Sequence, residues 1–379
     1  MKKKLLIFVL ISMAFSAQVS ALWTNKTMTI GGLSRSYRVY QSPNYNSAVP
    51  ASLIIALHGL GDNMTNFSGI GFNYIADTAN IICIFPQAVS DPIVGTAWNS
   101  GAGVLSYYPN ASVDDIGFIN ALIDTAKVDY AIDHSRVYLC GFSMGGFMTE
   151  KMALQSNSRI AAFGSMSGTF GSQITTFSPG RHIPIAHFHG THDSTVYYTG
   201  NLYGMDPDSL VKFWVTNNAC NLTPATYNYP DAVADSITIE RFDYTNGDPQ
   251  SDVSFYKMFG ATHTVLFQPT NDMTEPVELW LFLRRHTYAT AGIAEQKNTS
   301  NDTHIFPNPA TNQLNFTCQS ADISENSYIS VYNLQGQLVF QQKVYQPSTQ
   351  MDMSSLAKGI YFLKFKNESK SEVSRIVKE

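Results

Sequence analysis

One short segment constrains this chain more than any other: a serine between glycines, placed between an apolar strand and a helix. The run 136–140 predicts a buried strand, Gly141-Phe142-Ser143-Met144-Gly145 follows directly, and a helical pattern then continues through about Gln155. In such a strained strand-to-helix turn the serine hydroxyl is exposed, and the two glycines remove side chains that would clash. The segment therefore predicts a nucleophile, Ser143; a glycine-rich turn without chemistry is the alternative.

Around this segment, residues 22–289 alternate apolar strand-like runs with helical stretches. This alternation predicts an α/β fold with a mostly parallel sheet and helical crossovers. The runs 53–57 and 81–85 are apolar throughout, as expected for strands buried on both faces. The other predicted elements are an entry hairpin over 28–40, helices over 114–129 and 275–285, and strands at 160–166, 184–188, 237–244 and 253–259.

A serine hydroxyl becomes a strong nucleophile only when a base takes its proton. In a fold of this kind the partners follow in the order serine, acid, histidine, each on a loop after a strand. Asp193 follows the strand at 184–188 and His263 follows the last strand, so we expect Ser143, Asp193 and His263 to act together. Rivals are the acids Asp208 and Asp243 and the histidines His189 and His286, the last expected at the surface; Asp114 and Asp115 are expected to cap their helix.

An oxyanion would be held by backbone N–H groups from two loops. We expect one from Met144, directly after the nucleophile, and one from Leu60 in the loop after strand 53–57. In that loop, His58 is expected to shape the turn rather than to react. Three aromatic residues are candidates for substrate contact, because flat rings suit a sugar or a phenolic acid: Trp98, Tyr107 and Tyr108. The alternative is that these rings only pack the loop.

Cysteines and histidines could suggest disulfides or a metal. Cys83 and Cys140 lie inside predicted strands, and in a sheet of this type strand 53–57 should separate them by two strand spacings, so we expect buried thiols. Cys220, in a loop, and Cys318, in a distant segment, are likewise expected to be unbridged. The histidines His182, His187, His189 and His192 cluster in sequence. Two of them share a strand face, which could suit zinc, but no nearby Cys or Glu completes a ligand set, so we expect no metal and no cofactor.

The amino terminus resembles an export signal. Lys2 to Lys4 precede an apolar run, Leu5 to Phe15, and the small residues of Val19-Ser20-Ala21 fit a cleavage site. Residues 1–21 therefore predict a secretory signal peptide; a buried helix is the alternative. No later run is long enough to predict a transmembrane segment. With 24 Lys+Arg against 29 Asp+Glu, the chain lacks the basic excess that a nucleic-acid partner requires.

After residue 289 the pattern changes. Residues 290–303 are polar and predict a linker. Residues 304–379 contain short alternating strands, at 314–316, 328–332, 338–340 and 360–365, separated by turn residues. This pattern predicts a small all-β sandwich.

Several ordered motifs between residues 30 and 265 carry a family resemblance. They are Tyr37 to Tyr40, His58-Gly59, Ala97-Trp98-Asn99, Val113 to Ile119, Arg136-Val137-Tyr138, Gly141 to Gly146 and His189 to Asp193. Together they resemble secreted α/β-hydrolases of the polyhydroxybutyrate depolymerase and feruloyl esterase family, which overlaps carbohydrate esterase family 1. The resemblance implies the same Ser143–Asp193–His263 set and an ester substrate. The family often has Trp-Pro soon after the catalytic histidine, where this chain has Thr264-Val265-Leu266.

The carboxyl-terminal segment resembles a type IX secretion sorting domain. The motifs that carry this resemblance are Phe306 to Ala310, Val331 to Gly336 and Leu356 to Tyr361. The resemblance implies export to the surface or medium by the type IX machinery of a Gram-negative bacterium. The alternative is a carbohydrate-binding sandwich, which usually presents exposed aromatics including Trp; residues 304–379 contain no Trp.

These observations predict a secreted serine carboxylesterase that acts through an acyl-enzyme. Its expected substrates are feruloyl or acetyl esters of plant xylan, ahead of poly(3-hydroxybutyrate). A serine peptidase is an alternative, but on this scaffold it would require a large gating domain before the hydrolase core. A binding protein without catalytic activity is another alternative. The presence of Ser143, Asp193 and His263 in the expected order argues against it.

Overall fold

The computed structural model describes residues 22–104, 106–268, 271–288, 303–324, 326–333, 337–367 and 371–379. These residues form two compact units, divided near residue 290. The predicted signal peptide (1–21), nearly all of the predicted linker (290–302) and part of the second sorting motif (334–336) lie outside the described residues. The two units are described separately below.

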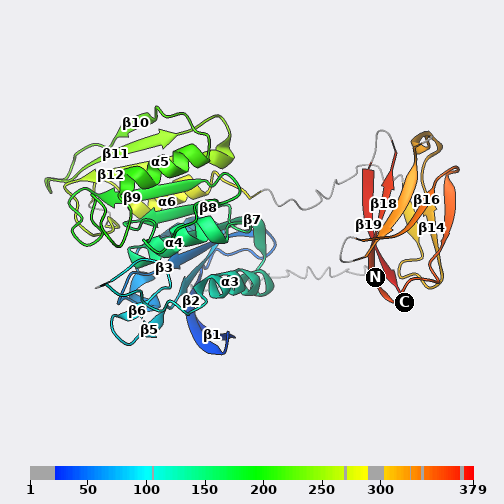
Figure 1. Ribbon diagram of the computed structural model, residues 1–379, viewed down its shortest axis with the longest axis horizontal. Helices are drawn as coiled ribbons and strands as arrows, with labels where there is room; N and C mark the ends of the chain where they lie inside the picture. Colours follow the sequence, from blue (N-terminus) through cyan, green and yellow to red (C-terminus); the bar gives the residue numbers. More distant parts are fainter. Residues whose placement is uncertain are drawn as a thin grey trace, which may run out of the picture. The chain divides into compact units, whose positions relative to one another are not determined.

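A ten-stranded sheet forms the centre of the first unit, in the order β1-β2-β4-β3-β7-β8-β9-β12-β11-β10 (Figure 1). The strands from β4 to β12 in this order run parallel, and the outer strands at both edges are antiparallel. The prediction of a mostly parallel α/β sheet is therefore confirmed. The strands are β1 Leu22–Ile30, β2 Leu33–Gln41, β3 Ala51–Leu57, β4 Ile81–Pro86, β7 Ile132–Phe142, β8 Ala162–Met166, β9 Ile185–Gly190, β10 Ala225–Asn228, β11 Thr238–Tyr244 and β12 Val253–Phe259.

Helices cover both faces of this sheet. Apolar residues of α3, α4 and α5 pack on one face, and those of α1, α2 and α6 pack on the other. The helices are α1 Met64–Phe67, α2 Phe72–Thr78, α3 Asp115–Asp129, α4 Met144–Gln155, α5 Pro207–Asn217 and α6 Glu275–Leu283. A short hairpin of β5 Val89–Asp91 and β6 Gly95–Ala97 stands apart from the sheet. Within the described ranges no helix combines the length and apolar character needed to cross a membrane.

Strand β3 lies between β4 and β7, as the sequence predicted. Cys83 on β4 and Cys140 on β7 are therefore on strands that are not neighbours, and both are buried free thiols. Burial raises the pKa of each of these two thiols. Cys220 is also a buried thiol, with its Sγ 3.0 Å from the carbonyl oxygen of Ser251.

One predicted surface residue is in fact buried. His286, just beyond α6, has no exposed area, and its ring lies 4.6 Å from the Phe282 ring. Its carbonyl oxygen accepts a hydrogen bond from the Tyr138 hydroxyl at 2.9 Å. The expectation of a surface His286 is wrong because the chain turns back against the sheet after α6 instead of leaving it.

The second unit is a sandwich of two antiparallel sheets, ordered β13-β14-β17 and β16-β15-β18-β19. Side chains from both sheets share one core, in which the rings of Phe316 and Phe365 lie 5.0 Å apart. The predicted all-β sandwich is confirmed, although three of its strands, β13, β17 and β19, were not foreseen. The strands are β13 His304–Phe306, β14 Gln313–Thr317, β15 Tyr328–Tyr332, β16 Leu338–Lys343, β17 Ser348–Asp352, β18 Gly359–Lys366 and β19 Ser371–Lys378.

Candidate active site

Ser143 occupies a strained turn between β7 and α4. Its backbone has φ 54° and ψ −121°, a conformation that non-glycine residues rarely adopt. The flanking glycines make the turn possible. A Cβ on Gly141 would lie 2.3 Å from the Gly145 carbonyl oxygen, and one on Gly145 would lie 2.2 Å from the Leu57 carbonyl oxygen. The sequence therefore has glycine at both positions because no other residue fits.

The structure brings Ser143, His263 and Asp193 together in a hydrogen-bonded chain. The distance from Ser143 Oγ to His263 Nε2 is 2.9 Å, and that from His263 Nδ1 to Asp193 Oδ2 is 2.7 Å. An ionised carboxylate only accepts hydrogen bonds, so the proton of the neutral imidazole belongs on Nδ1. The unprotonated Nε2 is then free to accept the serine hydroxyl proton. This is the geometry in which a histidine can act as general base toward a serine.

Asp193 is buried in a tight turn after β9. Its Oδ1 accepts hydrogen bonds from the backbone N–H groups of Thr195 at 2.9 Å and Val196 at 2.8 Å. Burial by itself raises the pKa of Asp193, but the hydrogen bonds from His263 and from the two N–H groups outweigh it, so the pKa lies below its usual value. The carboxylate is thus held ionised and oriented toward His263.

The rival acids have other partners. Asp208 accepts a hydrogen bond from the Tyr198 hydroxyl at 2.9 Å. Asp243 accepts one from Arg241 Nε at 2.9 Å and another from Ser254 Oγ at 2.6 Å. The acid that His263 does bind, through Nδ1 at 2.7 Å, is Asp193.

Leu60 and Met144 flank Ser143 at the edge of one cavity. Met144 is the first residue of α4, so its N–H has no acceptor within the helix. The peptide between Gly59 and Leu60 is fixed by His58, whose Nδ1–H donates to the Gly59 carbonyl at 2.7 Å. Because a trans peptide holds its C=O and N–H in opposite directions, the N–H of Leu60 faces away from this contact.

His58 has a structural position in this loop. Its Nε2 accepts the N–H of Ala88 at 3.1 Å, which requires that nitrogen to be unprotonated. Burial lowers the pKa of His58 and so favours this neutral form, although the bond to Gly59 acts in the opposite direction. The His58 imidazole connects the loop to the segment just after β4. It is not part of the hydrogen-bonded series Ser143–His263–Asp193.

A cavity of about 260 Å³ opens beside Ser143. None of the described residues that line it carries a charge, and several are aromatic or aliphatic. Sequence reasoning missed most of them: Ala102, Gly103, Val104, Phe147, Thr195, Val196, Tyr197, Asn201, Tyr203, Gly204 and Met205. Phe147 could have been found from its helical spacing of four residues after Ser143, whereas the loop residues carry no motif.

The three aromatic residues that were expected to contact substrate do not line the cavity beside Ser143. Trp98 has no exposed surface, and its indole Nε1–H donates to the His58 carbonyl at 2.8 Å, so the prediction that it contacts substrate is wrong. Tyr107 and Tyr108 are half-buried, with hydroxyls engaged by Asp91 and Ser172 respectively, and neither lines the cavity. Their contact with substrate stays a prediction.

The two strand histidines lie behind Asp193. His187 and His189 are buried on β9, with Nε2 of the first 3.2 Å from Nδ1 of the second. His189 Nε2–H donates to the Val196 carbonyl at 2.9 Å, in the turn that holds Asp193. Burial lowers the pKa of both imidazoles. Together they form a buried hydrogen-bonded chain from the core to the acid loop.

Comparison with known proteins matches both units to families. Residues 45–201 match the phospholipase/carboxylesterase family, and residues 304–379 match the secretion system C-terminal sorting domain. The acyl-protein thioesterase 1 homolog 2 of Dictyostelium discoideum is 31% identical over 164 residues, covering 38% of this chain and 70% of that protein.

Two further relatives are named as esterases. The bifunctional acetylxylan esterase/xylanase XynS20E of Neocallimastix patriciarum is 29% identical over 255 residues, covering 66% of this chain and 34% of that protein. The "Probable feruloyl esterase C" of Aspergillus oryzae is 27% identical over 194 residues, covering 50% of this chain and 64% of that protein. The chain spans a third to a half of the length of the first curated relatives it matches. On these matches and on its strand order, this chain belongs to the phospholipase/carboxylesterase family of α/β-hydrolases and carries a secretion-system sorting domain at its carboxyl end.

Proposed function

We propose that the chain is a secreted serine carboxylic-ester hydrolase that works through an acyl-enzyme. Ser143 Oγ attacks the ester carbonyl while His263 Nε2 takes its proton, and Asp193 stabilises the imidazolium that forms. The N–H groups of Met144 and Leu60 stabilise the oxyanion. His263 then protonates the leaving alcohol, and water, activated by the same histidine, releases the acid.

The observation that carries this proposal is the chain of two hydrogen bonds, 2.9 Å and 2.7 Å, that ends at a serine beside a cavity. A base and an orienting acid at these distances are what a serine nucleophile needs. The strained backbone of Ser143 supports the same role, because strain of this kind concentrates at functional sites.

The substrate follows from the cavity and the relatives. Its lining offers apolar and aromatic surface without charge, which suits a neutral acyl group. Relatives are named for acetylxylan and feruloyl esters. We therefore assign acetyl or feruloyl esters on xylan as the substrate class, with poly(3-hydroxybutyrate) as the second candidate. No step of this reaction uses a metal or cofactor.

Export is the second part of the proposal. The match of residues 304–379 to a secretion-system sorting domain supports passage through the type IX machinery of a Gram-negative bacterium. The amino-terminal pattern supports prior transfer across the inner membrane. An enzyme at the outer surface or in the medium would reach polymers that are too large to import.

Activity of residues 22–379 on four substrates tests this proposal: p-nitrophenyl acetate, methyl ferulate, acetylated xylan and poly(3-hydroxybutyrate). Ser143→Ala should lower kcat by about 10⁴- to 10⁶-fold. Ser156→Ala, at the other end of α4, is the matched control and should keep the activity. If Ser143→Ala keeps a tenth of the wild-type activity, the nucleophile is wrong. Clearing of the polyester without release of ferulate or acetate would reverse the order of the substrates.

A further inference from the structure

Trp98 is buried directly beneath the loop that carries Leu60. It has no exposed surface, and its ring centroid lies 5.2 Å from that of His58. The indole Nε1–H donates to the His58 carbonyl at 2.8 Å. Trp98 therefore contacts the residue two positions before the expected oxyanion donor, on the side of the loop away from solvent.

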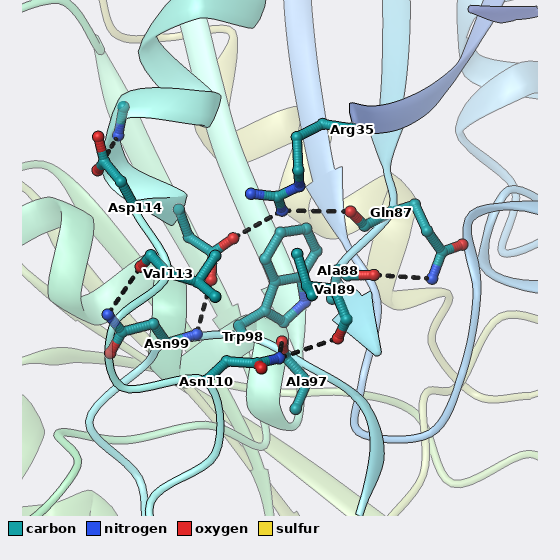
Figure 2. A network of polar contacts seen from close by, with 12 residues as sticks. Arg35, Gln87, Ala88, Val89, Ala97, Trp98, Asn99, Asn110, Val113 and Asp114 are labelled. Atoms are coloured by element: carbon teal, nitrogen blue, oxygen red, sulfur yellow. Dashed lines mark hydrogen bonds and ion pairs between the residues drawn. The ribbon is translucent and has the colours of Figure 1, made fainter. Parts of the chain in front are cut away.

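A network of polar contacts holds the backbone on both sides of Trp98 (Figure 2). The N–H of Asn99 donates to Asp115 Oδ2 at 2.7 Å, and Asp115 Oδ1 accepts Arg35 Nη2 at 2.7 Å. Both members of this ion pair are buried. Breaking such a pair is costly, because it leaves an unpaired charge inside the protein. The segment after Trp98 is thus firmly attached to the start of α3.

The segment before Trp98 is attached as well. Asn110 Nδ2 donates to the carbonyl oxygens of Ala97 at 2.8 Å and Val89 at 2.9 Å, which fastens β6 beside β5 (Figure 2). One strand residue earlier, the carbonyl of Thr96 accepts the N–H of Gly61 at 2.8 Å. The chain from Thr96 to Trp98 therefore contacts the Leu60 loop on both sides of Leu60.

The loop itself runs close to the nucleophile. A Cβ on Gly59 would lie 3.3 Å from the Ser143 Cβ, so a small movement of this loop changes the distance from Leu60 N–H to the reacting carbonyl. A backbone donor of this kind acts mainly in the transition state, where its position matters most. A support that fixes the loop should therefore affect the rate of the chemical step and not the binding of substrate.

We propose that Trp98 is a positioning residue of the oxyanion hole, which fixes the Leu60 N–H through its hydrogen bond to the His58 carbonyl. The inference rests on the proposed ester hydrolysis. It replaces the predicted contact between Trp98 and substrate with an indirect role, and the two roles differ in their kinetics. Loss of a substrate contact raises KM, whereas loss of transition-state positioning lowers kcat.

Trp98→Phe tests the proposal, because it keeps an aromatic ring in the core and removes the Nε1–H. We expect kcat to fall by about 10-fold, with KM within twofold of wild type. This is less than the roughly 10²- to 10³-fold loss typical when an oxyanion donor itself is removed. Trp214→Phe is the matched control. It removes another fully buried indole N–H, which donates to Glu150 Oε2 at 2.9 Å, and it should leave kcat within twofold.

Two further measurements keep the test decisive. Asn110→Gly suits the left-handed backbone at φ 50° and removes the side-chain amide that binds the carbonyls of Ala97 and Val89. It should therefore lower kcat several-fold even if Trp98→Phe fails to fold. Deuterium uptake by the peptide 58–62 should rise in Trp98→Phe and not in Trp214→Phe.

The outcomes separate the inference from the proposed function. If the wild type hydrolyses no ester, the proposed function fails, and the deuterium uptake still decides whether Trp98 holds the loop. An active wild type with unchanged kcat in both Trp98→Phe and Asn110→Gly would overturn the inference. A raised KM with unchanged kcat in Trp98→Phe would also overturn it, in favour of a substrate contact.

Discussion

Glu150→Gln should stabilise the protein, far more at alkaline pH than in acid. Glu150 lies on α4 and is fully buried, with Oε2 accepting the Trp214 indole N–H at 2.9 Å. Burial raises the pKa of Glu150 from its ordinary 4.5 to about 8, against the opposing effect of the hydrogen bond from Trp214. The folded protein therefore keeps a proton on Glu150 over a pH range in which the unfolded chain has lost it.

The sign and size of the effect follow from this difference. As pH rises from 4.5 to 8, the unfolded state releases the proton first, so the wild type loses stability by about 1.4 kcal/mol per pH unit. Glutamine has the shape of the protonated acid and never ionises. The variant should therefore be more stable than wild type by about 1 kcal/mol at pH 5 and by about 5 kcal/mol at pH 8.5.

Urea unfolding at pH 5 and pH 8.5 measures this difference. Tryptophan fluorescence reports on the first unit alone, because all four Trp residues precede residue 290. Glu275 is also buried, with a pKa raised to about 8. It is present in both wild type and Glu150→Gln, so its contribution cancels in the difference between their free energies of unfolding. Glu240→Gln, at a partly exposed position on β11, is the control for removing a carboxylate. Equal gains at pH 5 and pH 8.5 would refute the reasoning.

Three further predictions concern the thiols, the sorting domain and the cavity. Cys83, Cys140 and Cys220 should react with a thiol reagent only after denaturation, because all three are buried; a mass spectrum with Cys83 linked to Cys140 would contradict this. Deletion of residues 304–379 should leave ester hydrolysis by the purified protein within a few-fold, and in the native host the truncated protein should accumulate in the periplasm; normal release would exclude a sorting role. Tyr203→Ala should raise KM for methyl ferulate more than for p-nitrophenyl acetate, because the Tyr203 ring lines the cavity. Tyr108 does not line it, so an equal rise in KM for methyl ferulate in Tyr108→Ala would argue against this contact.

The sequence was sufficient for nine of the ten strands of the sheet, all but β10, and for the residues that meet at Ser143. Apolar runs such as that of β3 are unambiguous because a strand buried on both faces has little choice of residue. The nucleophile segment also needs glycine at fixed positions. Asp193 and His263 follow the carboxyl ends of two parallel strands, β9 and β12, which end on the same side of the sheet. These are local constraints that a sequence displays directly.

Residues whose position depends on distant contacts could not be predicted in the same way. Trp98 was placed at the correct end of the sheet, but its burial accompanies contacts with His58, which is remote in sequence. Glu150 lies on a helix that is buried nearly all round, and a glutamate there gives no sign of its unusual environment. The lining residue Tyr203 lies in a loop without a motif, so only the folded structure brings it to the cavity.

Covalent labelling of Ser143 is the most direct test of the proposed chemistry. A fluorophosphonate reacts with a serine only when a neighbouring base and an oxyanion site activate it. Intact and peptide mass spectra of labelled residues 22–379 should show one adduct, on Ser143. The adduct should be absent in Ser143→Ala and should form far more slowly in His263→Ala. An adduct on a different serine, or none in a wild-type protein that hydrolyses esters, would contradict the assignment of Ser143, His263 and Asp193.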